Sequence, residues 1–367
     1  MTGARSAIGD GSWWRYLVVA EAAAVGAVVV PGPIGIALGV GVGLSAIAAL
    51  LVGRRRWAGR HGRPWTVLAV ALASFLAGHV VRVLHQARSG GDAIPSPADL
   101  LFLAGYVLVA VAVVDLLRRR SPHANAPVVA ETLVIAVAAV VLSWTHLLAP
   151  SLAGWLAGSR GGWELAVLWL RPLADVVLVS LAARLGAGGR LHTPAWRLAG
   201  LALLGLVVGD TTWALTHLDV AQVPEPLSLL GSLTGYAAAG ATALHPSMAR
   251  LAARIPDPSA RPTRARLLVL GGAALAVPVS LLLRTVRTDP VVLGPALAGT
   301  CILFMLVLWR LTLLVAVLER SAALHRFMRH AGAALVGARG DDLPATAVRA
   351  LQQLLADDRR RGSLALA

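Results

Sequence analysis

Ten apolar runs, each about as long as a bilayer is thick, follow one another along the chain and are separated by short polar loops. A helix needs about 20 mostly apolar residues to cross the hydrocarbon core of a membrane. The sequence therefore predicts an all-α membrane protein with about ten transmembrane helices. The predicted spans are residues 13–30, 34–52, 65–86, 100–117, 127–149, 163–184, 196–218, 226–245, 267–286 and 291–317.

The composition agrees with a membrane protein and not with a soluble one. Hydrophobic residues make up 57% of the 367 positions, and charged residues only 14%. A soluble domain of this size carries about 25% charged residues. The formal charge of +15 would suit a nucleic-acid-binding protein, but the arginines lie in short loops between the apolar runs and form no basic domain. No nucleic-acid partner is therefore expected. The single cysteine, Cys301, excludes an intramolecular disulfide.

The arginines fall mainly in alternate loops, which predicts the orientation of the chain. Eighteen lie in the amino-terminal segment and in the loops of one side, whereas the opposite side holds only four, Arg88, Arg160, Arg284 and Arg287. Basic residues accumulate on the cytoplasmic side of membrane proteins. The sequence thus predicts a multi-pass protein of the cell membrane with both termini in the cytoplasm. The first span has the alternative interpretation of a cleaved signal peptide, because Arg5 precedes its apolar stretch.

An internal repeat is the second pattern. Trp65 and Trp196 are 131 residues apart, as are Gly78 and Gly209. The segment Leu103–Tyr106 recurs at an offset of 130 residues as Leu233–Tyr236. This offset covers four spans, so the two copies would have the same orientation, as parallel repeats do in some transporters. A chance match of small and aromatic residues is the alternative. The predicted parts are residues 1–64 with two spans, 65–195 with spans 3–6, and 196–317 with spans 7–10.

Two Gly-Tyr pairs in the repeated segments are candidate packing residues. Glycine lets a neighbouring helix approach closely, and a tyrosine hydroxyl inside a helix bundle needs a hydrogen-bond partner. The predicted packing residues are Gly105, Tyr106, Gly235 and Tyr236.

Ionisable residues inside a bilayer are costly and mark candidate functional sites. Several of them fall in the outer halves of their spans, and His79 and Asp210 occupy equivalent positions of the repeat. Arg171 and Asp175 lie four residues apart, so they share a helix face and can pair. One hypothesis is a ligand pocket open to the outside, and the alternative is an ion-pair network that holds the helices together. The candidate residues are His79, Arg82, His146, Arg171, Asp175, Asp210, Trp213 and His217.

No motif of a known catalytic chemistry accompanies these residues. The ten histidines have no metal-ligand spacing, and the chain contains no Walker-type phosphate loop and no Gly-x-Ser-x-Gly turn. The sequence therefore predicts no catalytic residue, no metal and no cofactor.

The segment after the last span shows a heptad-like pattern. Val317, Leu324, Met328 and Leu335 lie on one seam of a predicted cytoplasmic signalling helix, residues 318–340. Such a seam would pair two copies of the chain in a homodimer. The alternative is a helix that lies on anionic lipid, because its arginines favour that surface. Residues 341–367 are predicted to begin a soluble domain that continues beyond them.

Three segments of the membrane region carry a resemblance to a known family. Pro95–Tyr106, Gly209–Thr216 and Ala243–Met248 resemble the membrane region of actinobacterial cyclic-di-GMP signalling proteins. Residues 329–336 and 363–366 are similar to the opening of a GAF domain. The resemblance implies a cytoplasmic output part with GAF or PAS and then GGDEF or EAL domains as the partner of the membrane region. No GGDEF or EAL motif occurs in these residues, so no catalytic residue is carried over.

The function predicted from these patterns is a membrane sensor or input module, which couples an unknown signal to diguanylate cyclase or phosphodiesterase domains. A secondary transporter is the alternative that the repeat and the intramembrane charges favour. The input region of a sensor histidine kinase is a further alternative, because related membrane regions also precede kinases.

Overall fold

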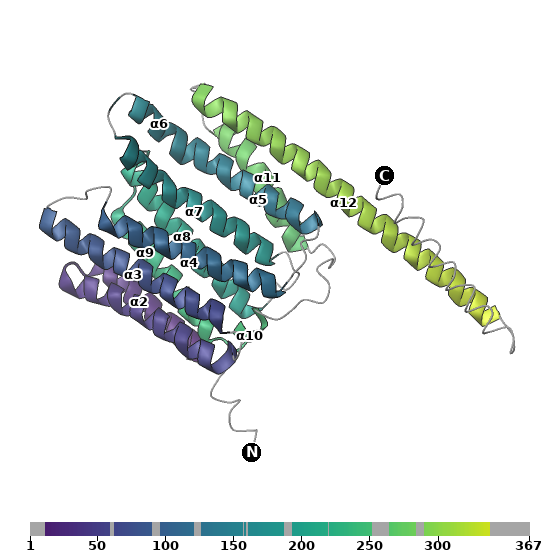
Figure 1. The fold of residues 1–367 in the computed structure, drawn as a ribbon, viewed down its shortest axis with the longest axis horizontal. Coiled ribbons are helices and arrows are strands. Elements are labelled where there is room, and N and C mark those ends of the chain that lie inside the picture. Colours follow the sequence, from purple (N-terminus) through teal and green to yellow (C-terminus); the bar gives the residue numbers. More distant parts are fainter. Residues whose placement is uncertain are drawn as a thin grey trace, which may run out of the picture. The chain divides into compact units, whose positions relative to one another are not determined.

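The computed structural model describes residues 12–58, 62–89, 96–120, 126–156, 158, 161–186, 193–218, 220–251, 264–283 and 290–337, and the regular structure in these residues is entirely helical (Figure 1). The helices are α1 (Ser12–Val29), α2 (Pro33–Gly53), η1 (Arg54–Ala58), α3 (Arg63–Ser89), α4 (Pro97–Arg120), α5 (Ala126–Ser143), η3 (Trp144–Leu148), α6 (Ala149–Leu156), α7 (Gly162–Gly186), α8 (Pro194–His217), α9 (Glu225–Leu244), α10 (Met248–Leu251), α11 (Arg264–Leu283) and α12 (Pro290–Gly337).

Each predicted span coincides with a helix. Eight helical stretches among the described residues are long and apolar enough to cross a membrane. The two predicted spans that are not among these eight stretches are the first and the ninth, which correspond to α1 and α11. α1 has 18 residues and carries both Arg15 and Glu21, and the apolar stretch of α11 covers only Leu270–Leu282. The chain is thus an all-α multi-pass membrane protein, as predicted, while the number of ten crossings and their orientation stay predictions.

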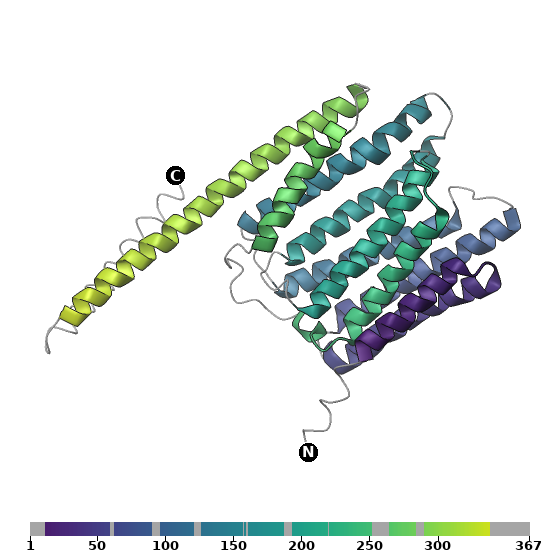
Figure 2. The same cartoon turned by 180° about the vertical axis from the view of Figure 1, so that it is seen from behind.

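Six helices form a closed ring. α2, α3, α4, α7, α8 and α9 each pack against the next, and α9 packs against α2. Figure 1 shows α2, α3, α4 and α7 side by side, and Figure 2 shows α8 and α9 in green on the opposite side, with α1 in purple. α1 packs against α2 and α9 outside this six-helix ring, α5 packs against α7, and α11 packs against α5.

The contacts within the six-helix ring relate α2 to α7. α2 packs between α9 and α3 in the same way as α7 packs between α4 and α8. Positions 131 residues after those of α2 also fall within α7. α2 and α7 therefore hold corresponding places in the six-helix ring, although they share few identical residues. The boundaries of the repeat, residues 65–195 and 196–317, stay predictions.

The two hairpins α3–α4 and α8–α9 pack in corresponding registers. A Cβ atom added to Gly78 would lie 3.2 Å from the Phe102 side chain, and one added to Gly209 would lie 2.5 Å from that of Ser232. Gly105 and Gly235 likewise face Phe75 and Leu206, respectively. Each of these residues in the first hairpin has its counterpart 130 or 131 positions later. This correspondence is what a duplication of the hairpin predicts.

Backbone contact between α8 and α9 depends on two facing Gly-x-x-x-Gly motifs. Gly205 and Gly209 on α8 face Gly231 and Gly235 on α9. A Cβ atom on Gly205 would lie 2.6 Å from the backbone nitrogen of Gly235. Small residues at this spacing let transmembrane helices approach until their backbones touch, which maximises van der Waals contact where no hydrophobic force acts.

Ser247 fixes the α9 end of the α8–α9 hairpin. Its hydroxyl accepts a hydrogen bond from the backbone N–H of Ala195 at 3.1 Å and lies 2.9 Å from Nδ1 of His245. Ala195 is in the first turn of α8, where N–H groups have no partner within the helix. The residue that precedes α8, Thr193, makes no side-chain cap. Ser247, from beyond α9, thus supplies the cap that the sequence next to α8 does not.

Ser247→Ala is expected to lower the free energy of unfolding by about 1 kcal/mol, the usual value of a lost helix cap. The matched control is Thr193→Ala, which removes a hydroxyl that caps nothing and should change the stability little. Thermal unfolding of the purified variants in one detergent measures both. Equal losses in the two variants would contradict the capping role of Ser247.

α12 is a single helix of 48 residues. The chain divides into two compact units, residues 1–307 and 308–367. In the first unit, Ala296 and Leu303 of α12 are buried with Val134 and Val141 of α5, and Gly299 packs closely against Val141. In the second unit, the helix continues to Gly337, and Met328 is exposed. The side chains of Val317, Leu324 and Leu335 and all of residues 341–367 lie outside the described residues, so the predicted seam and soluble domain stay predictions.

Candidate functional site: a charged cluster inside the six-helix ring

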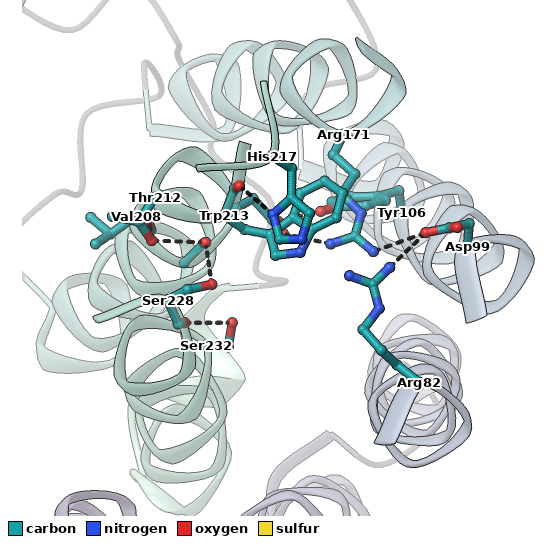
Figure 3. A network of polar contacts seen from close by, with 12 residues as sticks. Arg82, Asp99, Tyr106, Arg171, Val208, Thr212, Trp213, His217, Ser228 and Ser232 are labelled. Carbon is teal, nitrogen blue, oxygen red and sulfur yellow. Dashed lines mark hydrogen bonds and ion pairs between the residues drawn. The ribbon is translucent and has the colours of Figure 1, made fainter. Parts of the chain in front are cut away.

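Asp99 brings two arginines together inside the six-helix ring. One of its carboxylate oxygens, Oδ1, accepts hydrogen bonds from Nη2 of Arg82 at 2.8 Å and from Nη2 of Arg171 at 3.2 Å. The other oxygen, Oδ2, accepts from the backbone N–H and the hydroxyl of Ser96 at 2.8 and 3.1 Å. Figure 3 shows both guanidinium groups converging on this carboxylate. The bond from the Ser96 N–H is one half of a capping box at the start of α4, so the helix end itself orients the Asp99 carboxylate.

Two aromatic side chains flank the guanidinium groups. The central carbon of Arg171 lies 4.1 Å from the centre of the Phe102 ring and 3.9 Å from that of Trp213. The corresponding distances for Arg82 are 5.2 and 4.9 Å. Cation–π contacts of this kind gain strength when they are shielded from water, and both arginines are buried. Phe102 and Trp213 therefore hold the positive charges in place and supply part of the stabilisation that water would otherwise give.

Asp210 and His79 make crosswise contacts between the two hairpins. The hydroxyl of Tyr106 on α4 donates a hydrogen bond to the carboxylate of Asp210 on α8. The side chain of His79 on α3 packs edge-on against that of Tyr236 on α9, with 6.3 Å between ring centres. His79 and Asp210 are equivalent positions of the repeat, as are Tyr106 and Tyr236. Each hairpin thus places its polar residue against the tyrosine of the other.

Arg171 also lies near Asp210, with 4.0 Å between Nη1 and the carboxylate oxygen Oδ1. The structure does not form the predicted ion pair of Arg171 with Asp175 within α7. The ion pairs described for Arg171 are with Asp99 and Asp210. A partner on the same helix is not preferred here, because carboxylates from α4 and α8 reach the guanidinium directly across the six-helix ring. Asp175 still interacts electrostatically with Arg171 and Asp210.

Two buried polar groups beside Asp210 have no hydrogen-bond partner among the described residues. They are the Asp175 oxygen Oδ1 and the Tyr236 hydroxyl. Asp175 is 6% exposed, and Tyr236 is 1% exposed. Buried polar atoms are only rarely left without a partner, and each case calls for a physical explanation.

Two aromatic pairs lie in the last part of α8 and between η3 and α7. The His217 side chain is stacked on that of Trp213, with 4.2 Å between ring centres, and its Nδ1 lies 2.9 Å from the Trp213 carbonyl oxygen. Trp144 packs edge-on against Trp169, whose Nε1 donates to the hydroxyl of Ser151. His146 lies with Trp144 in η3, a π-helical segment. Such segments are frequent at functional sites.

Most of the predicted site residues therefore come together. The structure joins His79, Arg82, Arg171, Asp210 and Trp213, with Asp175 and His217 beside them; His146 is part of η3. Tyr106 and Tyr236, predicted as packing residues, also belong to this set, whereas Gly105 and Gly235 pack against Phe75 and Leu206.

Sequence reasoning missed Asp99 and Phe102. Asp99 directly precedes the predicted span 100–117, so it was not counted among the charges at membrane depth. The signal that could have found it is the run Ser96-Pro97-Ala98-Asp99, a capping-box pattern with proline at the first helical position. A carboxylate fixed in this way points back over the helix end, towards the neighbouring arginines.

The side chains of this site are suited to binding charged groups. Among the described residues, no group of three or more histidine, cysteine, aspartate or glutamate side chains is placed to hold a metal ion. The cluster instead offers two guanidinium groups and three carboxyl groups in a buried environment, where each charge interacts strongly with the others. We call Arg82, Asp99, Arg171, Asp175 and Asp210 the charged cluster.

No family model, curated protein or solved structure matches this chain. The resemblance to cyclic-di-GMP signalling proteins is therefore untested by these comparisons, and function has to be argued from the fold and the charged cluster.

Proposed function

We propose that this chain is the membrane input module of a signalling protein and couples a change inside the six-helix ring to a cytoplasmic output domain. The observation that carries the proposal is the length of α12, 48 residues without a break. At about 1.5 Å per residue such a helix is about 72 Å long, while the hydrocarbon core is only about 30 Å thick. A helix that spans the bilayer and continues so far suits the transmission of movement to a soluble domain.

A continuous path of packed helices connects the charged cluster with the first part of α12. Arg171 and Asp175 lie on α7, which packs against α5. α5 in turn contributes Val134 and Val141 to the buried group that contains Ala296 and Leu303 of α12. A signal that changes the ion pairs of Arg171 would shift α7 and, through α5, bias the position of α12. Such a device works by population shift between two helix arrangements, each with its own set of ion pairs.

The output domain that we propose is of the diguanylate cyclase or phosphodiesterase type, because the membrane segments resemble those of cyclic-di-GMP signalling proteins. Under this proposal both termini are cytoplasmic, as the distribution of arginines predicts. The continuation of α12 after its apolar part would then lie in the cytoplasm and is suited to pairing two copies of the chain. A histidine kinase is the other output that the same arrangement would serve.

We expect the charged cluster to control an output domain that is fused to α12. In this test, residues 1–335 are joined to an intact diguanylate cyclase, and cyclic-di-GMP is measured in cells that express equal amounts of each fusion. Asp210→Asn and Arg171→Leu should each change the output several-fold, because each alters the contacts between α4, α7 and α8. The control is Asp115→Asn, which breaks a partly exposed pair with Arg119 on the same helix. Unchanged output in both cluster variants would contradict the proposal.

Secondary transport is the alternative function, and one observation favours it. Buried charges lie between helices of a repeat, and α7 contains a proline, Pro172, next to Arg171. The transport hypothesis predicts that the purified chain in liposomes accumulates a solute under an ion gradient. Uptake that disappears in Arg171→Leu would favour transport over signalling. The part of α12 that follows its apolar stretch has no evident role in transport.

A further inference from the structure

The charges of the charged cluster do not sum to zero. Arg82 and Arg171 carry two positive charges, and Asp99, Asp175 and Asp210 carry three negative charges when ionised. Asp99 is shared by both arginines, and Asp210 lies 4.0 Å from Arg171. Within the charged cluster, the third carboxylate has no guanidinium of its own to neutralise it. An uncompensated charge inside a bilayer is strongly unfavourable, so one further positive charge belongs to this site.

The geometry locates this missing charge between α7, α8 and α9. Asp175 and Asp210 interact electrostatically with each other, and Asp210 does so with Tyr236. Both flanking residues carry a buried polar atom without a partner, the Asp175 oxygen Oδ1 and the Tyr236 hydroxyl. Two carboxyl groups and a tyrosine hydroxyl are oxygen ligands, which suit a proton shared between carboxyls or a hard monovalent cation.

The surroundings leave few other places for a positive charge. Arg171 on α7 interacts electrostatically with both carboxyl groups of the pair, and His79 on α3 interacts electrostatically with both arginines. A charged imidazole there would therefore be repelled by two guanidinium groups. α5 packs against α7 and carries Glu131 near its start, and His146 lies in η3, which follows α5. Among the described residues, the other titratable or charged groups with a contact to the pair are Arg82 on α3, Tyr106 on α4 and Tyr236 on α9, while Asp99 on α4 contacts the arginines.

We propose that Asp175 and Asp210 together bind one exchangeable monovalent positive charge, a proton or a sodium ion, with Tyr236 as an additional ligand or hydrogen-bond partner. This site goes beyond the proposed function, because it follows from charge and burial whether the chain signals or transports. Release of the positive charge leaves two carboxylates facing each other, and their repulsion separates α7 from α8. Occupancy of the site and the arrangement of the six-helix ring are thus coupled.

The first experiment uses the wild-type chain of 367 residues, purified in detergent. Its thermal midpoint is measured while choline chloride is replaced by sodium chloride at constant ionic strength, with potassium chloride as the ion control. If sodium binds, the midpoint rises saturably with sodium and not with potassium, and Asp175→Asn lowers the apparent sodium affinity at least tenfold. Asp115→Asn, whose carboxylate pairs with Arg119 near the end of α4, keeps the wild-type response.

The second experiment distinguishes a proton from a metal ion. Infrared difference spectra of the same preparations report protonated carboxyl groups at neutral pH. If a proton occupies the site, the wild type shows one such group in the absence of sodium. Its band is lost in Asp175→Asn or Asp210→Asn and is unchanged in Asp115→Asn.

Three results would overturn the proposal. The first is a wild-type chain with neither a sodium-dependent midpoint nor a protonated carboxyl group, a result that needs no variant to fold. The second is a signal that survives in both Asp175→Asn and Asp210→Asn. The third is a signal lost only in His79→Gln, which would assign the positive charge to the imidazole.

Discussion

Replacing Asp99 with asparagine is expected to lower the free energy of unfolding by about 3 kcal/mol. Asp99 accepts hydrogen bonds from both Arg82 and Arg171, so the substitution leaves two buried guanidinium groups without their shared counter-charge. Loss of one partner from a buried ion pair costs about 3–5 kcal/mol in soluble proteins. Single polar contacts between membrane helices average only about 0.6 kcal/mol, because the unfolded chain in the membrane also finds partners. The Asp99 carboxylate makes two ion pairs and also caps a helix. We therefore expect its loss to cost an amount near the lower end of the range of about 3–5 kcal/mol.

Asp115→Asn is the matched control, because Asp115 is on the same helix and also pairs with an arginine. Its side chain and that of Arg119 are 25% and 28% exposed, compared with 10% for Asp99. This pair is partly exposed and lies within a single helix at its end, so its loss should cost at most about 0.5 kcal/mol. Unfolding by a denaturing detergent, followed by circular dichroism, measures both variants. If the two lose the same stability, Asp99 does not act as the shared counter-ion of the arginines.

Gly205→Ala is expected to destabilise the protein by about 3 kcal/mol, at the upper end of the usual effect of overpacking. The added Cβ atom would lie 2.6 Å from the backbone nitrogen of Gly235 and 2.7 Å from the carbonyl oxygen of Gly231. Backbone atoms cannot change rotamer, so α8 and α9 must separate along their whole contact. The separation also moves Asp210 and Trp213, which lie one and two turns further along α8.

Gly200→Ala tests whether contact, and not helix propensity, causes this effect. Gly200 is on the same helix, and a Cβ atom there meets nothing within 4 Å. Alanine favours a helix over glycine by up to about 1 kcal/mol, so this control should be as stable as the wild type or slightly more so. The comparison uses the thermal midpoints of both variants in one detergent. A Gly205→Ala protein that is as stable as Gly200→Ala would show that the two helices are not in backbone contact.

The sequence predicted the positions of the helices well because the bilayer imposes them. Inside hydrocarbon each backbone N–H and C=O group must be satisfied within its own segment, so an apolar run of sufficient length becomes a helix. The predicted span 163–184 thus corresponds to α7, Gly162–Gly186, and 196–218 to α8, Pro194–His217. The same argument identified Arg171 and Asp210 as exceptional residues, because charge at membrane depth is rare.

The partners of those charges depended on the tertiary structure. Asp99 was missed because it lies at the very start of α4, and hydropathy alone does not tell an interfacial carboxylate from a buried one. Arg171 was matched to Asp175 by spacing on one helix, although Asp99 and Asp210 approach it from two other helices. Spacing along one helix describes neighbours within that helix and contains no information about carboxylates that other helices bring near.

The sequence by itself determined that this chain is a helical membrane protein and which side chains would be costly in lipid. Only the tertiary structure decided which helices are neighbours, including the contact of α2 with α9 that closes the six-helix ring. The physical reason is that lipid tails are as apolar as the side chains that face them. Hydrophobicity therefore inserts each helix without selecting its partner, and close contacts such as Gly205 with Gly231 make that selection.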